Sequence, residues 1–387
     1  MDGILHLGFN GHLQEDSFKV FEKYYPGKNI MLAKPPRKND ALKIHLPEDV
    51  FRWMDYGNPE YYKEILELCK NKKVGRLLLH SASKSSVNLA EYLKTRIKGC
   101  KVYWLFWGFE LYTALGEDLG VSFVDEKFNV FKPRTYLMPN RIKHYLRRLR
   151  YGINYVDVIK KASEVADYFC FWNKYDYDLY TKYFGNKVNY KYFGYTCRYR
   201  ENEQNKEETY DFPQKTKAVI INHQASVTGN HVTLMRRFSE IDPDRTFKVY
   251  MPLSYGSRYL KQYCVKYGYK LFKNSFYPIL EYMPREKYFD IINKPQVAMF
   301  GQKRQEAAGN IGRLLIEGTK VFLREDNPML KYYRDKGYYV FSFENDLNSI
   351  EDLNPLTYDE KVHNRKVWYS TRTYYEDFMP DFFNDEQ

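Results

Sequence analysis

The strongest constraint on the fold is a repeated alternation of short apolar runs with longer amphipathic stretches along the 387 residues. In the first half, the pattern predicts strands at 4–7, 76–80, 102–107 and 168–172, and helices near 59–70, 86–97, 155–166 and 174–184. In the second half, it predicts strands at 218–221, 247–251, 297–300, 320–323 and 338–342, and helices near 230–240, 256–267, 285–293, 309–317 and 328–336. This alternation indicates two open, mostly parallel α/β domains.

A polar, charged stretch separates the two halves. Residues 201–217, ENEQNKEETYDFPQKTK, include Pro213 and are the best linker candidate. We therefore expect domains at 1–205 and 206–355, and a C-terminal segment at 356–387 that packs back on the first domain or hangs free. Ligands of open parallel sheets lie beyond the carboxyl ends of the strands, so we expect a site in a cleft between the two domains.

The charge of the chain is basic and unevenly distributed. The net charge is +12, and nine Lys or Arg lie between Lys132 and Lys161 against a single acid. Arg141, Arg147 and Arg148 belong to this stretch, and its helical spacing is typical of a helix that lies on a membrane surface. A basic face also suits a nucleic-acid backbone or an anionic substrate, and an ordinary solvated face is a further alternative.

Membrane spans and disulfides are not expected. No apolar run approaches the roughly 20 residues that a membrane span needs, and the amino terminus lacks the apolar core of a signal peptide. The five cysteines are scattered and form no CxxC pair. They are therefore interpreted as reduced thiols in a cytosolic protein without a structural zinc site.

Residues 299–323, MFGQKRQEAAGNIGRLLIEGTKVFL, are the most informative stretch for function. A predicted strand ends in a polar loop with Arg304 and Gln305, and small residues, Gly309 and Asn310 among them, then open a helix. Backbone N–H groups and the helix dipole favour an anion at such a helix start, and an arginine can bind phosphate oxygens through two hydrogen bonds. The stretch therefore suits a diphosphate, although an ordinary strand–loop–helix turn would give the same pattern.

Two further polar loops follow strands in the second half. In 222–231, Ser226 and Thr228 are good helix caps, and Asn230 and His231 are expected in the first helical turn. This loop and the one with Arg304 can hold a diphosphate from both sides, or the residues simply cap the helix.

A third loop, at 251–257, carries Ser254 and Tyr255, and Glu281 precedes the next helix. The backbone near Glu281 is placed to contact a nucleotide base. A plain turn at 251–257 and a surface acid at 281 are the alternatives.

In the first half, candidate chemistry follows two strands. His80 ends one strand, and Trp107 and Glu110 follow another. Aromatic rings beside an acid suit a sugar, and a carboxylate there is a candidate for acid or base catalysis. The alternatives are a structural histidine and an aromatic core beside an exposed acid.

Taken in order, these residues resemble glycosyltransferase family fifty-six, the bacterial TDP-N-acetylfucosamine:lipid II N-acetylfucosaminyltransferases of enterobacterial common antigen synthesis. The matching elements are His6, His80, Trp107–Gly108 with Leu111–Tyr112, Ala225–Ser226 with Thr228 and Asn230–His231, 252–256, 280–284 with Tyr288, Arg304–Gln305 with Ala307 and Gly309–Asn310, 318–323 and Asn327–Pro328. Departures from the family pattern are Asn222, His223, Gln224, Glu306 and Glu110. The departures near the donor loops leave the identity of the nucleotide sugar open.

The resemblance implies a GT-B fold with two Rossmann-like domains, an acceptor-binding, membrane-facing domain first and a donor-binding domain second. It implies a nucleotide-sugar donor and an undecaprenyl-diphosphate-linked acceptor at the cytoplasmic face of the bacterial inner membrane, where the enzyme is peripheral. It also implies no metal and no cofactor, in agreement with the absence of a DxD-like motif in these loops.

Roles follow from the same resemblance. The donor-binding residues are expected to be Ser226, Thr228, Asn230, His231, Ser254, Tyr255, Glu281, Arg304, Gln305, Gly309 and Asn310. Glu110 or His80 is expected to orient or deprotonate the acceptor hydroxyl. Trp107, Arg141, Arg147 and Arg148 are expected to meet the acceptor or the membrane.

Three alternatives remain at this point. One is a GT-B transferase with another donor that builds capsule or O-antigen repeats, and another is a sugar-binding relative without turnover. The third is a nucleic-acid-binding protein that uses the basic stretch. The polar loops cluster at strand ends and the basic residues elsewhere, so a nucleic-acid partner is not expected.

Overall fold

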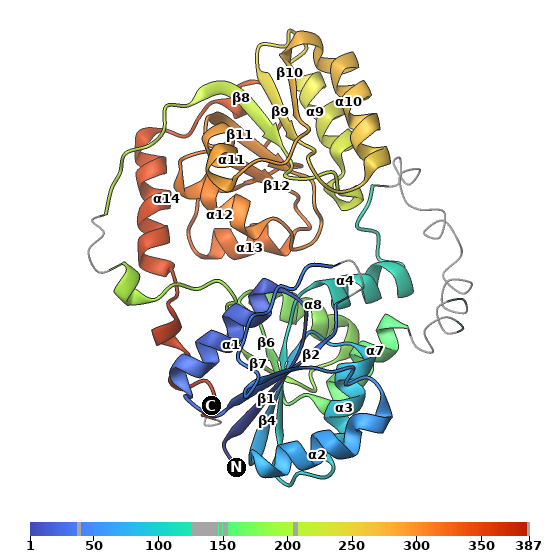
Figure 1. Ribbon diagram of the computed structural model, residues 1–387. Helices are drawn as coiled ribbons and strands as arrows, with labels where there is room; N and C mark the ends of the chain where they lie inside the picture. The colour runs from blue at the N-terminus through green and yellow to red at the C-terminus, as the bar shows by residue number, and fades with distance from the viewer. Residues whose placement is uncertain (37–39, 126–145, 147–148, 150–153, 204–207, 385–387) are drawn as a thin grey trace. The chain divides into compact units, whose positions relative to one another are not determined.

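The computed structural model describes residues 1–36, 40–125, 146, 149, 154–203 and 208–384, and it divides into two compact units (Figure 1). Unit 1 comprises Met1–Gly120, Asn140–Lys206 and Thr373–Gln387, and unit 2 comprises Val121–Pro139 and Glu207–Arg372. The predicted membrane-contacting residues Arg141, Arg147 and Arg148 lie outside the described residues.

Within its described residues, unit 1 contains a seven-stranded parallel sheet with the order β3-β2-β1-β4-β5-β6-β7. The strands are β1 (Gly3–Phe9), β2 (Asn29–Lys34), β3 (Phe51–Trp53), β4 (Val74–His80), β5 (Lys101–Leu105), β6 (Tyr168–Cys170) and β7 (Asn189–Lys191). Its helices are α1 (His12–Tyr24), α2 (Tyr62–Asn71), α3 (Lys84–Lys94), α4 (Phe109–Thr113), α7 (Tyr155–Val165) and α8 (Lys174–Phe184). The central strands are buried on both faces, as parallel strands between helices usually are.

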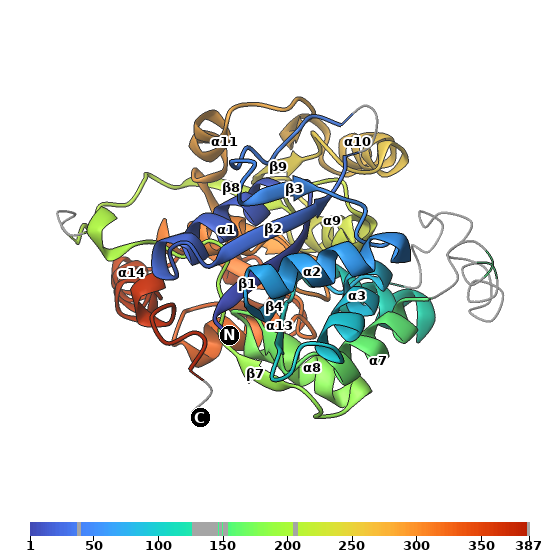
Figure 2. The same ribbon diagram turned by 60° about the horizontal axis from the view of Figure 1, so that its bottom comes forward.

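Two different layers cover this sheet. Helices α2, α3, α7 and α8 pack in sequence against one another (Figure 2). On the other face, α1 packs with the C-terminal residues: the Phe21 and Phe382 rings are 5.4 Å apart, and the Tyr25 hydroxyl donates to the carbonyl oxygen of Met379 at 2.6 Å. The end of the chain therefore completes the core of unit 1.

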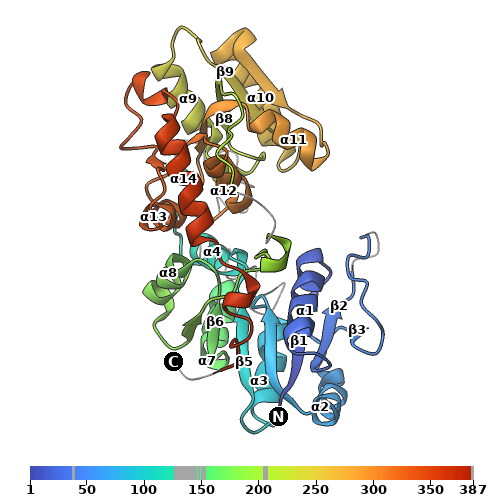
Figure 3. The ribbon, with the colours of Figure 1, turned by 90° about the vertical axis from the view of Figure 1, so that its left-hand side faces the viewer.

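Within its described residues, unit 2 contains a six-stranded parallel sheet with the order β10-β9-β8-β11-β12-β13. The strands are β8 (Thr216–Ile221), β9 (Lys248–Pro252), β10 (Phe276–Ile279), β11 (Pro295–Phe300), β12 (Lys320–Leu323) and β13 (Phe341–Ser342). The helices are α9 (His231–Ile241), α10 (Arg258–Phe272), α11 (Arg285–Ile292), α12 (Ala308–Ile316), α13 (Pro328–Asp335) and α14 (Tyr358–Thr371). Helix α9 packs beside α10, and α12 packs beside α14 (Figure 3).

Both strand orders reverse direction once. The chain moves outward from β1 to β3 and then restarts on the other side at β4, and it does the same from β8 to β10 and then at β11. The loops that leave β8 and β11 therefore diverge to opposite faces of the unit 2 sheet. Such a point is where open α/β sheets bind ligands.

The predicted class, two parallel α/β domains, is confirmed. Strands β2, β3, β7 and β10 and helices α1, α4 and α14 were not among the predicted elements. Among the described residues, no helix is long and apolar enough to span a membrane, and no group of His, Cys, Asp or Glu is arranged to hold a metal ion.

The buried Arg365 of α14 gives a test of how unit 2 is held together. Its guanidinium donates to the carbonyl oxygens of Ile316 at 2.9 Å, Thr209 at 3.0 Å and Asp211 at 2.9 Å, and it lies 3.5 Å from the carboxylate of Glu317. Arg365→Ala should lower the free energy of unfolding by about 3 kcal/mol, because three carbonyl groups lose a charged donor and Glu317 keeps Arg313 alone of these two ion-pair partners.

Urea-induced unfolding measures this change. Lys366→Ala, which removes an exposed cation from the neighbouring position, is the matched control and should change the free energy of unfolding by less than about 0.5 kcal/mol. Equal unfolding midpoints for the two variants would contradict the role given to Arg365.

Candidate functional site

Three loops of unit 2 meet at the carboxyl ends of its strands. They follow β8 at 222–230, β9 at 253–257 and β11 at 301–307. A Cβ atom on Gly301 would lie 2.1 Å from the carbonyl oxygen of Gly229, and one on Gly256 would lie 2.4 Å from that of Ala225. The loops are thus in backbone contact, which only glycine permits at these two positions.

Two asparagines fix the same contact. The Asn222 amide donates to the carbonyl oxygen of Gly229 at 2.8 Å and accepts from the N–H of Gly301 at 2.9 Å. The Asn230 amide donates to the carbonyl oxygen of Gly301 at 2.7 Å. Asn230 stands immediately before α9 in a left-handed conformation, with φ of 47°. Its side chain therefore binds backbone groups of the loops.

Glu306 is the centre of the polar contacts between these loops. Its carboxylate accepts hydrogen bonds from Gln224 Nε2 at 2.5 Å, Thr228 Oγ1 at 2.9 Å and Arg304 Nε at 3.1 Å. His223 Nε2 lies 4.0 Å away. Burial alone would raise the pKa of Glu306, but the Arg304 guanidinium and the Thr228 hydroxyl hold it below its ordinary value. The carboxylate is therefore charged at neutral pH.

His231 begins α9 behind this cluster. Its ring is buried against Gly229, and burial lowers its pKa to about 4. Neither ring nitrogen has a hydrogen-bond partner with good geometry among the described residues. His231 is therefore a neutral imidazole at pH 7, and the charged Glu306 lies within its electrostatic reach.

A cavity of about 400 Å³ opens beside the Glu306 loop. Its walls come from the loops after β9 and β10, from α11 and from the first turn of α12. The lining residues are Ser254, Tyr255, Glu281, Tyr282, Met283, Arg285, Tyr288, Phe289, Ala307, Ala308, Gly309 and Asn310. Aromatic rings, one carboxylate and one guanidinium are thus placed around a space large enough for part of a small-molecule ligand.

The start of α12 borders this cavity. Ala307 precedes the helix with φ of 68° and has no side-chain oxygen to cap it, so the first N–H groups of the helix are available to a ligand. A Cβ atom on Gly309 would meet no other atom within 4 Å, so the space beside the first turn is open. The geometry suits an anion.

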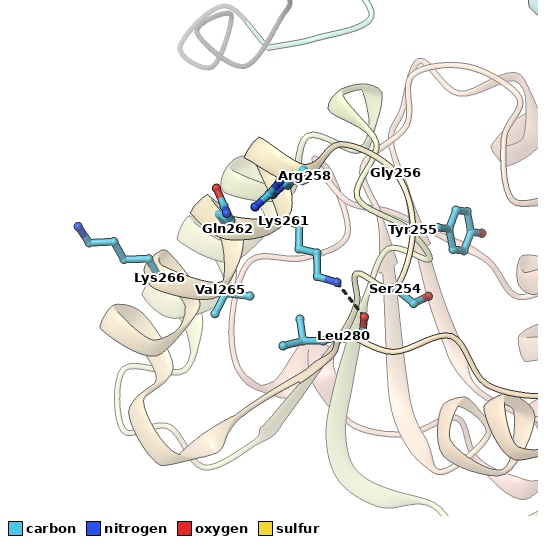
Figure 4. A pocket seen from close by; sticks show the side chains of 9 residues that line it. All are labelled: Ser254, Tyr255, Gly256, Arg258, Lys261, Gln262, Val265, Lys266 and Leu280. Atoms are coloured by element: carbon cyan, nitrogen blue, oxygen red, sulfur yellow. Dashed lines mark hydrogen bonds between the residues drawn. The ribbon is translucent and has the colours of Figure 1, made fainter.

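A second, more open cavity of about 630 Å³ lies on the other side of the loop after β9 (Figure 4). Ser254 and Tyr255 line both cavities, while Arg258, Lys261 and Lys266 of α10 line only this one. Lys261 spans the second cavity and donates to the carbonyl oxygen of Leu280 at 2.8 Å.

In unit 1, His80 belongs to a buried histidine pair. His6 Nδ1 and His80 Nε2 are 3.0 Å apart, and His6 Nε2 lies 3.1 Å from Asn29 Oδ1. Burial lowers the pKa of His6 to about 4 and that of His80 well below its ordinary value. Both rings are therefore neutral at pH 7.

Glu110 is fully buried in the first turn of α4. Its Oε1 accepts from Trp104 Nε1 at 3.1 Å, from the N–H of Trp107 at 3.3 Å and from the N–H of Ala82 at 3.4 Å. Burial raises the pKa of Glu110 to about 7. The other oxygen, Oε2, has no partner among the described residues. This carboxyl group can therefore gain or lose a proton near neutral pH.

Other buried polar groups follow the same strands of unit 1. Gln14, His80 Nδ1 and Ser81 Oγ also lack hydrogen-bond partners among the described residues. Trp107 packs against Phe9, with ring centroids 5.6 Å apart, and against Tyr195, at 4.8 Å. The carboxyl end of this sheet therefore retains unused hydrogen-bonding capacity next to an aromatic ring.

Asp125 is a site residue that the sequence analysis missed. In unit 2, its carboxylate binds Arg324 at 3.0 and 3.2 Å, Lys303 at 3.0 Å and Thr233 at 2.5 Å. Its N–H donates to Asn230 Oδ1 at 2.9 Å. Burial alone would raise the pKa of Asp125, but these partners lower it to about 2. Asp125 belongs to none of the predicted strand-end loops, so no pattern in the sequence revealed this network.

The structure groups the predicted donor residues in two places. The Glu306 carboxylate binds two of them directly, Thr228 and Arg304. Ser226 is linked to it through Thr228, whose hydroxyl oxygen lies 2.7 Å from that of Ser226. Five others, Ser254, Tyr255, Glu281, Gly309 and Asn310, line the first cavity. Gln305 lies half-buried between Arg304 and Glu306.

The chain is similar in structure to several solved glycosyltransferases. The chain matches sucrose-phosphate synthase of Thermosynechococcus elongatus with a TM-score of 0.60 and 9% identity, covering 97% of this chain and 96% of the other. It matches HepE of Anabaena, solved with UDP and glucose, with a TM-score of 0.55 and 9% identity over 97% of both chains. The lipopolysaccharide outer core galactosyltransferase WaaB matches with a TM-score of 0.53 and 10% identity, covering 99% of this chain and 96% of the other.

These matches establish the fold. The chain has the GT-B fold of glycosyltransferases, as the resemblance implied. No protein-family model matches the chain, and no characterised protein matches it in sequence. The identities are low enough that the likeness concerns architecture alone.

The Asp125 network makes a testable contribution to stability. The lowered pKa of this group means that its stabilisation is fully present above the unfolded-state pKa near 3.8 and is lost as the pH falls through about 2. Asp125→Asn should therefore lower the free energy of unfolding at pH 7 by about 2 kcal/mol, and the difference from the natural chain should shrink below about pH 4.

Chemical denaturation at several pH values measures this effect. Asp290→Asn, which changes an exposed carboxylate on α11, should show a difference of less than about 0.5 kcal/mol at every pH. A stability difference for Asp125→Asn that does not vary with pH would exclude the ionised carboxylate as its cause.

Proposed function

We propose that the chain is a metal-independent glycosyltransferase. It would move a sugar, fucose-like or deoxy-amino, from a nucleotide diphosphate donor to an undecaprenyl-diphosphate-linked saccharide in bacterial surface polysaccharide synthesis. One observation carries the proposal. Next to the loop that carries Arg304, a cavity with aromatic and acidic walls adjoins the uncapped start of α12.

The donor would bind in unit 2. The N–H groups at the start of α12 and the Arg304 guanidinium would hold the diphosphate and stabilise the charge that grows on it as the glycosidic bond breaks. Tyr282 and Glu281 line the cavity near the loop after β10, where they would stack on the base and contact its edge. His231 would support the loop as a neutral group.

The names of the structural neighbours support this assignment. HepE was solved with UDP and glucose, and WaaB is named as a galactosyltransferase. Both match nearly the full length of the chain. The guanidinium and the helix start would supply the positive charge that a metal ion supplies in other transferases, so neither a metal nor a cofactor is required.

The acceptor would bind in unit 1. Glu110 would deprotonate the acceptor hydroxyl, because its pKa of about 7 suits a general base and its Oε2 is not used by the described residues. His80 would orient the acceptor, and Trp107 would stack on a sugar ring. Arg141, Arg147 and Arg148 would bind the anionic surface of the cytoplasmic membrane, with the protein attached peripherally.

A second donor class fits the same cavity. His223, Gln224 and Glu306 depart from the family fifty-six pattern, and both His223 and Gln224 lie next to the Glu306 carboxylate beside the candidate diphosphate site. A GT-B transferase with another donor, acting in capsule or O-antigen assembly, is therefore the alternative.

A screen of nucleotide sugars by thermal shift tests the donor proposal. A true donor at one hundred times its Kd should stabilise the chain by about 2.7 kcal/mol. Arg304→Ala should weaken its binding roughly 10- to 100-fold, because a charge-assisted hydrogen bond to phosphate is lost. Arg258→Ala, in the second cavity, is the control and should bind normally. Unchanged binding by Arg304→Ala would rule out this diphosphate site.

The acceptor proposal makes a separate prediction about pH. If Glu110 is the base, kcat/KM for transfer should rise with pH through about 7, since the deprotonated form is active. Glu110→Gln should lower kcat at least about 100-fold and remove this rise, while donor affinity stays unchanged. A pH profile of the same shape in Glu110→Gln would assign the base to another residue.

A further inference from the structure

Glu306 is unusual because it is an acid in a region built to receive an anion. The three loops at 222–231, 252–257 and 301–307 contain a single carboxylate, Glu306. Its side chain is only 12% exposed. It directly precedes Ala307 and the uncapped start of α12, where the diphosphate of a donor would be placed.

The groups that bind Glu306 are of the kind that a diphosphate needs. A guanidinium N–H, a hydroxyl and a side-chain amide donate to it, from Arg304, Thr228 and Gln224. In the ligand-free chain, this carboxylate therefore occupies the Nε–H of Arg304, the residue that the proposed function gives to the diphosphate, and the hydroxyl of the neighbouring Thr228. A diphosphate that binds the Nε–H of Arg304 or the hydroxyl of Thr228 therefore has to displace the Glu306 carboxylate from that group.

We propose that Glu306 is a positioning residue that holds Arg304 and Thr228 in place until a nucleotide diphosphate takes them over, and that the Glu306 carboxylate then takes up a proton. This inference rests on the proposed function and deepens it. The proton comes from solvent and adds to one carboxylate oxygen; no other bond forms or breaks.

The need for a proton follows from the surroundings of Glu306. The charged and titratable groups that face it are Arg304 on its own loop, His223 and His231 from the loop after β8 and the start of α9, and Tyr255 from the loop after β9. Burial lowers the pKa of both histidines, and burial raises that of Tyr255. Arg304 is therefore the one cation in this set at neutral pH.

Once Arg304 turns to the diphosphate, Glu306 would be a buried anion beside another anion. Burial and like charge both disfavour the ionised carboxylate, so the neutral acid becomes the stable form. A neutral Glu306 can still accept from Gln224 and can donate its new O–H to a phosphate oxygen. The same residue thus changes from a competitor of the ligand into a donor toward it.

Isothermal titration calorimetry with UDP-glucose and dTDP-glucose tests this directly. Their diphosphate diesters do not titrate between about pH 6 and pH 8, so any proton exchanged belongs to the protein. Binding heats in two buffers of different ionisation enthalpy should show uptake of up to one proton per ligand. The affinity should rise roughly three- to tenfold for each unit by which the pH falls.

The Glu306→Gln variant distinguishes proton uptake by Glu306 from a purely structural role in which its side chain only holds the loop in place. It should bind without proton uptake, with an affinity that does not vary with pH, and roughly tenfold more tightly than the natural chain at pH 8. Glu306→Asp keeps a carboxylate and should keep the uptake. Glu317→Gln, at the other end of α12 in a similarly buried ion pair, is the matched control and should behave like the natural chain.

Each other outcome overturns the proposal. Binding by the natural chain without proton uptake, a measurement that needs no variant, removes this inference and leaves the proposed function intact. If Glu306→Gln still takes up a proton on binding, the group that is protonated is His223 and not Glu306. Weaker binding of Glu306→Gln at every pH gives Glu306 a bracing role only. If neither protein binds either nucleotide sugar, the proposed function and this inference both fail.

Discussion

The backbone contact between the loops after β8 and β11 is the constraint on which the unit 2 site depends. Gly301 lies against the carbonyl oxygen of Gly229, and the amide of Asn222 closes the contact from both sides. These loops leave neighbouring central strands toward opposite faces of the sheet, so they would separate without such a tie. Because they stay together, Thr228 and Arg304 can reach a single carboxylate.

Glu110 and Glu306 show how hydrogen-bond partners decide the charge of a carboxyl group. Glu110 and Glu306 are both largely removed from water. Neutral N–H groups bind Glu110, so the cost of burial prevails and its pKa rises to about 7. A guanidinium binds Glu306, and its pKa falls. One acid can therefore exchange protons near neutrality, whereas the other stays ionised until its partner leaves.

The sequence predicted the architecture better than the contacts. Strands β8, β11 and β12 are continuous apolar runs because both of their faces are buried, and such runs are easily recognised. Strand β10 was missed because Pro278 interrupts a short edge strand, where proline is tolerated. Helix α1 was missed because its apolar residues are few among charged ones. The polar loops were placed correctly because each directly follows a predicted strand.

The partners of individual side chains could not be predicted in the same way. The amide of Asn230 binds the backbone of Gly301, 71 residues away, a contact that the sequence around Asn230 does not show. Glu306 was noticed only as a departure from a family pattern, since nothing local shows that Gln224 and Thr228, about 80 residues earlier, donate to it. Such contacts depend on which loops the sheet order brings together, and strand order is not encoded in local periodicity.

The way the polypeptide is divided between the units has a consequence for synthesis. Unit 1 is assembled from three separate stretches, and the last of them, at 373–387, supplies Phe382 and Met379 to one face of its sheet. A ribosome finishes that stretch only after all of unit 2 has been made. The aromatic face around Phe21 therefore stays uncovered during nearly the whole of translation, which makes the nascent protein a natural client for chaperones that bind exposed apolar surface.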